Sequence, residues 1–550
     1  MKWKTALLAA TLGALVAACA SSSNDADSER IEVTAARITA QELASTEAKA
    51  VAAKRSAAAP LLMAPGLPPP PAENRETYQS LQDNPVKVVT REPVSTFSID
   101  VDTGAYSNVR RHLRAGELPP ADAVRVEELL NYFPYADSVQ RTEHPFTVQT
   151  EVAPSPWKPG NQLLRIRIKA VDDKTGTLPP ANLVFLVDVS GSMASPDKLP
   201  LVQATLKMLV KQLRAQDRIA LVVYAGRTHV ELPSTAGDQQ ETILAAIDRL
   251  TAGGATAGEA AMTLAYGQAR AGFIPGGINR ILMATDGDFN VGVTSLEQLK
   301  DMVARERQSG VSLTMLGFGT GNYNDYLMEQ LADVGNGNFA YIDSVDEGRK
   351  VLIDELRATL NTVASDVKLQ VEFNPNQIAE YRLIGYENRM LREEDFNNDN
   401  IDAGEIGAGK TVTALYELTP VGAATLHEPL RYQTVTTSAS SAPNHELAYL
   451  RIRYKPLGAD NSTLLSHAIT PAHVRSRLTA ASSDFRFAAA VAGFGQLLRG
   501  GPYLGTFSYD DITALAQSGL DNDDAGYRRE FVRLVQIARD LAKPASAPSP

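Results

Sequence analysis

The sequence predicts an α/β protein in which a doubly wound sheet is flanked by a β-sandwich-like region and by helices near the C-terminus. Strand-like and helix-like segments alternate over residues 181–350. Strand-like segments without intervening helices follow within residues 367–454, and helical patterns return after residue 482. Regular alternation is typical of a parallel sheet with helices on both faces, whereas consecutive strands are typical of antiparallel sandwiches.

The chain is too long for one hydrophobic core, because its 550 residues exceed the size at which single cores stop growing. We expect about three folded units on this ground. The net charge is −11, and the chain contains no block rich in Lys and Arg. Nucleic acid is therefore excluded as the expected partner.

The N-terminus predicts export. Residues 1–18 combine Lys2 and Lys4 with an apolar stretch over residues 6–18, which is too short to span a bilayer and is typical of a signal peptide. The stretch ends at Cys19, the only cysteine, so an internal disulfide and a thiol nucleophile elsewhere are excluded. Residues 16–19 resemble a bacterial lipobox, which implies that Cys19 is lipidated. The alternative is a cleaved signal peptide with a chance cysteine.

The two residues that follow Cys19 refine the expected location of the protein in the cell envelope. Ala20 and Ser21 stand where an Asp would otherwise follow the lipidated residue. By resemblance to Gram-negative lipoproteins, this favours the outer membrane, facing either the periplasm or the surface.

Residues 19–75 predict a disordered tether. They are rich in Ala, Ser and charged residues and end in a proline-rich run over residues 65–71. A proline-rich docking site is the alternative. The tether would hold the folded part away from the membrane.

Residues 76–175 form the first folded region. We expect a strand at 96–102, helices at 103–116 and 126–132, and strands at 145–152 and 162–170. Asp100 and Asp102 face the same way on the first strand, which suggests an acid or metal pair. We favour the alternative of a solvated strand face or a turn cap.

The central unit spans residues 181–350. Its first strand, residues 183–187, is a continuous apolar run, as expected of a buried parallel strand. Further strands are expected at 219–224, 280–285, 312–318 and 339–342. Helices are expected at 198–213, 238–250, 257–272, 296–309, 323–334 and 345–364.

The last region, residues 366–545, changes character from strands to helices. Strands are expected at 367–373, 379–386, 410–418 and 446–454, and helices at 485–498, 509–517 and 525–542. We expect the strands within 145–170 to pair with those within 367–454. The α/β unit would then be an insertion between two parts of one β-rich body.

Oxygen-bearing side chains follow the strands of the central unit. Asp188, Ser190 and Ser192 follow the first strand, Asp286 follows the strand at 280–285, and Thr256 ends a glycine-rich turn. Ligands of open α/β sheets bind at the carboxyl ends of the strands. Carboxylates and hydroxyls without thiol or imidazole suit Mg²⁺, Mn²⁺ or Ca²⁺ rather than zinc.

These five residues resemble the metal-ion-dependent adhesion site (MIDAS) of the von Willebrand factor type A (VWA) domain, over residues 181–345. The resemblance implies one divalent ion, ligated directly by the two serines, with Thr256 joining directly or through water. It implies that the two aspartates act mostly through water. An acidic side chain of a partner would fill the open coordination position. The alternative is that these residues only cap turns and helices.

Residues 76–170 and 366–545 resemble the flanking regions of a lipoprotein-like group of bacterial VWA proteins, the YfbK-like family. The predicted function is therefore metal-dependent protein binding by an envelope lipoprotein. A metal-dependent hydrolase and a structural envelope protein with an unused site are the alternatives. Against an enzyme, the sequence has no Gly-x-Ser-x-Gly or His-Glu-x-x-His motif, and its seven histidines lack metal-ligand spacing.

Residues 395–402 superficially resemble a calcium loop. Asn400 and Ile406 stand at the positions where such a loop needs Gly and Glu. We therefore expect a polar turn there, with weak Ca²⁺ binding as the alternative.

Overall fold

The computed structural model describes residues 74–99, 102–135, 143–171, 178–254, 258–287, 296–355, 358, 360–401, 403–428, 430, 445–459, 461–521 and 523–543. Residues 73–550 form one compact unit. The predicted signal peptide, Cys19 and nearly all of the predicted tether lie outside the described residues. Within the described ranges, no helix has the length and apolar character needed to cross a membrane.

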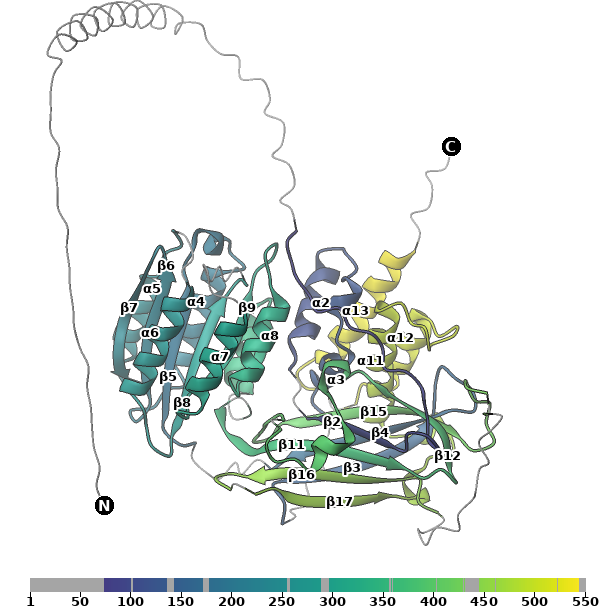
Figure 1. Ribbon diagram of the computed structural model, residues 1–550. Coiled ribbons are helices and arrows are strands. Elements are labelled where there is room, and N and C mark those ends of the chain that lie inside the picture. Colours follow the sequence, from purple (N-terminus) through teal and green to yellow (C-terminus); the bar gives the residue numbers. More distant parts are fainter. Residues whose placement is uncertain are drawn as a thin grey trace, which may run out of the picture. The chain divides into compact units, whose positions relative to one another are not determined.

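The central sheet has six strands in the order β10-β9-β8-β5-β6-β7 (Figure 1). Five of them are parallel, and β7 lies antiparallel to β6 at one edge. Their bounds are β5 Ala181–Asp188, β6 Arg218–Ala225, β7 Arg227–Ala236, β8 Ile278–Thr285, β9 Ser312–Phe318 and β10 Phe339–Ile342. The doubly wound α/β fold expected from the sequence is confirmed.

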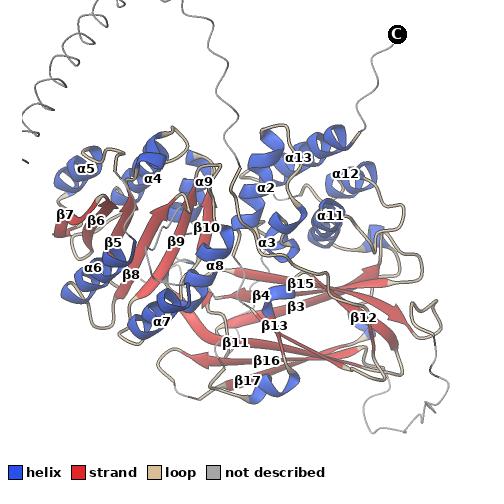
Figure 2. Cartoon of the chain, turned by 45° about the horizontal axis from the view of Figure 1, so that its top comes forward, coloured by secondary structure: helices blue, strands red, loops and turns tan. Residues whose placement is uncertain are grey.

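Helices cover both faces of this sheet (Figure 2). Alternate residues of β5 enter two separate cores, with Phe185 in one and Leu186 in the other. This explains why β5 reads as a continuous apolar run. The first core includes α4 Leu199–Val210 and α5 Gln240–Asp248. The second includes α6 Gly258–Ala271, α7 Leu296–Arg307 and α8 Asp325–Val334.

Two antiparallel sheets form the sandwich. One has the order β1-β12-β15-β4-β3, and the other has the order β13-β2-β11-β16-β17, with β14 paired to β11. Phe97, Ile166, Leu369 and Tyr416 from the two sheets share one core. The bounds are β1 Lys87–Val88, β2 Val94–Ser98, β3 Phe146–Pro154, β4 Gln162–Ala170, β11 Thr362–Phe373, β12 Ile378–Ile384, β13 Met390–Leu391, β14 Ile406–Gly407, β15 Thr411–Pro420, β16 Ala448–Pro456 and β17 Thr463–Ile469.

Strands from before and after the central sheet pair with each other. Ile166 of β4 lies opposite Ala414 of β15, and Phe97 of β2 lies opposite Leu369 of β11. The expected pairing is therefore confirmed. The central sheet and its helices are an insertion in the chain that builds the sandwich.

The helix predicted at 345–364 is too long. The structure has α9 Val345–Arg349, a π-helical turn η3 Lys350–Asp354, helical residues at Ala358 and Leu360, and then β11 from Thr362. Thr362 and Ala364 pair with β14, so the β-branched residues at this point begin a strand.

Five helices form a third core beside the sandwich (Figure 1). They are α2 Gly104–Arg114, α3 Val126–Asn131, α11 Ser483–Leu498, α12 Tyr509–Gln517 and α13 Tyr527–Ala542. Phe133, Phe487 and Phe531 meet edge to face at its centre. The helices expected in both flanking regions are confirmed, with ends within about two residues.

Candidate metal centre

Four of the five predicted ligands are described, and the sheet brings them to one edge. β5 ends at Asp188 and β8 ends just before Asp286, and the two strands are parallel neighbours. Both aspartates are fully buried. Thr256 lies outside the described residues, so its role stays a prediction.

Asp188 organises the loop after β5. Its Oδ1 accepts a hydrogen bond from the backbone N–H of Ser190 at 2.8 Å, and its Oδ2 accepts one from Thr285 Oγ1 at 3.3 Å. Burial raises the pKa of Asp188 to about 6 against the opposing effect of the Ser190 bonds, and the nearby charge of Asp286 adds to the rise. A cation at this position would favour the ionised form.

The two serine hydroxyls have the spacing of adjacent metal ligands. Ser190 Oγ and Ser192 Oγ are 3.0 Å apart. Two neighbouring ligands of an octahedral ion with Mg–O bonds of about 2.1 Å lie about 3 Å apart. Ser190 is buried, whereas Ser192, in the 3₁₀ turn η2 Gly191–Ala194, is exposed. The donor set therefore fits Mg²⁺, with one side open to solvent.

The glycine-rich turn lies against the serine loop. Gly191 N–H donates to the carbonyl of Gly254 at 3.1 Å, and Gly253 N–H donates to the carbonyl of Val189 at 2.7 Å. These bonds place the described part of the turn, which leads to Thr256, beside the candidate ligands.

Asp286 is held by two residues that the sequence did not reveal. Its Oδ2 accepts hydrogen bonds from Lys198 Nζ at 2.9 Å and from Asn322 Nδ2 at 3.0 Å. Burial raises the pKa of Asp286, but the bonds from Asn322 and Lys198 outweigh it, so the net shift is downward. Asn322 follows β9, and a search of every strand's carboxyl end would have found it. For Lys198, the sequence pattern predicts only the start of a helix.

The other acidic candidates have structural partners. The strand predicted at 96–102 is β2, which ends at Ser98, before Asp102. Asp102 is buried, and its Oδ1 accepts from the backbone N–H of Phe339 at 2.8 Å, so of the two expected roles the solvated strand face was wrong. Asp100 lies outside the described residues. Asp395 pairs with Arg392, and Asp399 pairs with Arg453. Among the described residues, no group of three or more His, Cys, Asp or Glu could hold a metal.

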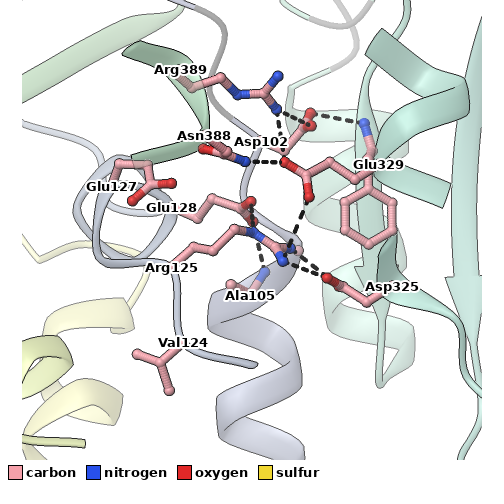
Figure 3. A network of polar contacts seen from close by, with 12 residues as sticks. Asp102, Ala105, Val124, Arg125, Glu127, Glu128, Asp325, Glu329, Asn388 and Arg389 are labelled. Atoms are coloured by element: carbon pink, nitrogen blue, oxygen red, sulfur yellow. Dashed lines mark hydrogen bonds and ion pairs between the residues drawn. The ribbon is translucent and has the colours of Figure 1, made fainter. Parts of the chain in front are cut away.

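A buried ionic network joins α8 to the flanking regions (Figure 3). Arg125 contacts Asp325 and Glu128, and Arg389 contacts Glu329 at 3.0 Å. A second group of ion pairs holds the entry to α9, where Arg110 Nη2 lies 2.5 Å from Asp343 Oδ1 and 2.7 Å from Glu347 Oε2. The last elements of the inserted unit are therefore held by the regions that surround it.

A doubly wound sheet with this loop set defines a VWA domain, and residues 182–353 match the family model described as von Willebrand factor type A domain. Residues 72–165 match the model described as von Willebrand factor, and residues 358–541 match that described as "Uncharacterized protein YfbK, C-terminal". The chain is 51% identical over 468 residues to YfbK of Escherichia coli (strain K12), covering 84% of this chain and 80% of that one. The chain belongs to the YfbK family.

More distant matches cover shorter stretches. Protein sll0103 of Synechocystis is 26% identical over 212 residues, which is 38% of this chain and 49% of that protein. Human inter-alpha-trypsin inhibitor heavy chain H2 is 25% identical over 203 residues, 36% of this chain and 21% of that protein. A solved von Willebrand factor type A structure from Catenulispora acidiphila covers 71% of this chain and 89% of its own, at 15% identity and a TM-score of 0.40.

VWA domains commonly bind a divalent metal at a MIDAS, and the domain supports a role in protein interaction or adhesion.

Proposed function

We propose that this protein is an envelope lipoprotein that binds a protein partner through a divalent cation, Mg²⁺ or alternatively Mn²⁺ or Ca²⁺. The observation that carries the proposal is the pair of serine hydroxyls 3.0 Å apart beside two buried aspartates. Ser190 and Ser192 would ligate the ion directly. Asp188, Asp286 and Thr256 would complete the site, the two aspartates mostly through water.

The chemistry of this set favours binding over catalysis. Neutral hydroxyls leave most of the charge on a bound ion, and Mg²⁺ usually keeps several waters. A carboxylate from a partner would replace one of these waters at the exposed side, near Ser192. The hydroxyls of Ser190 and Ser192 lie 3.0 Å apart, so two neutral oxygens stand side by side, an arrangement that suits ligation of a cation. We therefore propose that the protein is not an enzyme.

The membrane attachment is also a proposal. It rests on the signal-peptide pattern of residues 1–18 followed by Cys19, with residues 19–75 as tether. The pattern after the cysteine favours the outer membrane of a Gram-negative cell.

Calorimetric titration of the purified full-length chain with Mg²⁺ and Mn²⁺ tests the site. We expect the wild-type chain to bind one ion, and we expect Ser190→Ala or Asp188→Ala to abolish binding. Ser195→Ala is the matched control, because Ser195 lies in the same loop and bonds to Asp197 instead. Unchanged binding in Ser190→Ala with a folded far-UV spectrum would contradict the proposal.

Partner binding is tested separately. Captured proteins are identified by mass spectrometry from pull-downs with Mg²⁺ or with EDTA, using wild-type and Ser190→Ala chains as bait. We expect a partner that is retained only by wild type with Mg²⁺. Identical captures in all four conditions would contradict the metal bridge.

A further inference from the structure

Lys198 lies inside the candidate metal centre, although nothing in the sequence pattern assigns it there. Its side chain is 8% exposed. The ammonium donates to Asp286 Oδ2 at 2.9 Å and to Asn322 Oδ1 at 2.9 Å. Asn322 in turn donates to the same oxygen of Asp286, so three side chains form a closed ring of hydrogen bonds.

The backbone makes room for this lysine. Gly319, just after β9, has φ of +74°, and a Cβ at this position would lie 2.3 Å from Lys198 Cγ and 2.4 Å from its Cε. A glycine is therefore required here both by the backbone conformation and by the passage of the lysine stem. The backbone at Gly319 therefore leaves the space through which the side chain of Lys198 reaches Asp286.

We propose that Lys198 is a positioning residue that keeps Oδ2 of Asp286 from ligating the metal directly and lowers the affinity of the site for its cation. The inference rests on the proposed function of the site. One oxygen of Asp286 already accepts two hydrogen bonds, one of them from a cation, which makes it a poor direct ligand. Asp286 can then act on the ion only through water or through its other oxygen.

The charge balance gives the second part of the proposal. Asp188 and Asp286 together carry two negative charges when ionised, and the ammonium of Lys198 offsets one of them. A bound divalent ion is therefore left with a net positive charge that an acidic partner can neutralise. The same ammonium repels the ion, and removing it relieves a repulsion that corresponds to about tenfold in affinity even at a water-like dielectric.

The test is a Mn²⁺ titration, by calorimetry, of the full-length chain carrying Lys198→Met or Lys198→Gln. Methionine keeps most of the stem without the charge, and glutamine keeps a hydrogen-bond donor. Lys207→Met is the matched control, since Lys207 lies on α4, the helix that Lys198 directly precedes, but pairs with Asp248 at the surface. We expect both Lys198 variants to bind Mn²⁺ about tenfold or more tightly than wild type, with no change in the control.

A thermal readout separates this role from a structural one. In Lys198→Met, Asp286 has lost its cationic partner, so without metal the Tm of this variant should be lower than that of wild type. Saturating Mn²⁺ should raise the Tm of the variant by more than it raises the Tm of wild type. A lower Tm with unchanged or weaker Mn²⁺ binding in both variants would overturn the inference while leaving the proposed metal site intact. Detectable Mn²⁺ binding by both Lys198 variants but not by wild type would support the inference. Absence of Mn²⁺ binding by wild type and by both variants would overturn both proposals.

Discussion

Arg125 forms a two-point ion pair with Asp325, although 200 residues separate them in the sequence. Arg125 precedes α3 in the first flanking region, and Asp325 is the first residue of α8 in the VWA domain. Both side chains are 1% exposed, and Figure 3 shows Glu128 and Glu329 around the same guanidinium. A single cation thus neutralises carboxylates from two regions of the chain.

Replacing Arg125 with Ala should therefore destabilise the protein strongly. The change leaves buried carboxylates without their cation, and loss of one partner of a buried pair costs about 3–5 kcal/mol. Urea denaturation measures the free energy of unfolding. Arg533→Ala is the control, because Arg533 is exposed on α13, and it should change stability by less than about 0.5 kcal/mol. Equal effects of the two substitutions would contradict this account.

Glu127, next to this network, should make stability depend on pH. Burial raises its pKa from 4.5 to about 7, and the charge of Glu387 adds to the rise. Because the folded state binds this proton more tightly than the unfolded state does, stability should fall as pH rises from about 4.5 to 7.

Glu127→Gln isolates this effect. Glu127 Oε2 accepts from the backbone N–H of Tyr386 at 3.0 Å, and an amide oxygen can accept the same bond. We expect the variant to be more stable than wild type at pH 8, by on the order of 1–3 kcal/mol, with a smaller difference at pH 5.5. A difference that grows as pH falls would show that the sign is wrong. Urea denaturation at the two pH values gives the answer.

Gly319→Ala should destabilise the protein more than Gly321→Ala does. Both glycines have positive φ, +74° and +92°, so alanine is strained at either position. A Cβ on Gly321 would have no atom within 4 Å, whereas one on Gly319 would overlap the stem of Lys198. We expect an excess cost of about 1–3 kcal/mol for overpacking at Gly319.

Shortening the lysine should remove that excess. In the Gly319→Ala, Lys198→Ala double variant, we expect a favourable coupling of about 0.5–3 kcal/mol between the two sites. A strictly additive double-mutant cycle would show that the two side chains do not meet. The four unfolding free energies of the cycle, measured by urea denaturation, decide this.

Cys19→Ser should release the protein from membranes. The substitution removes the only sulfur that a lipid could modify. Cell fractionation followed by immunoblotting of the soluble and membrane fractions checks this, with wild type as reference. Retention of the variant in the membrane fraction would count against the lipid anchor.

The sequence predicted residues of the candidate metal site only where they follow a strand end. Asp188 and Asp286 were found because continuous apolar runs mark buried parallel strands, and the residues after such runs share one edge. Lys198 was missed because its burial depends on the backbone of Gly319, which is far away in the sequence. No local pattern of residues reports such a contact.

Two elements of the fold likewise depend on contacts that no local sequence pattern reports. The edge strand β17 was not predicted because its residues, including Ser466 and His467, are partly exposed and do not alternate cleanly. The helix over 345–364 was overextended because apolar spacing does not separate the end of a helix from the start of a buried strand. Pairing of Thr362 with Gly407 decides the structure there, and that contact is not local.

The insertion of the VWA domain between β4 and β11 has a mechanical consequence. These two strands belong to different sheets of the sandwich, and each is hydrogen-bonded to a neighbour on both sides. Tension applied to the VWA domain, for example at the proposed metal site, would therefore be transmitted along the chain to two interior strands of the sandwich at once. Among the described strands, such a load would act on five ladders of backbone hydrogen bonds, those of β4 with β3 and β15 and those of β11 with β2, β14 and β16, whereas a domain joined through one terminal strand could be peeled away bond by bond.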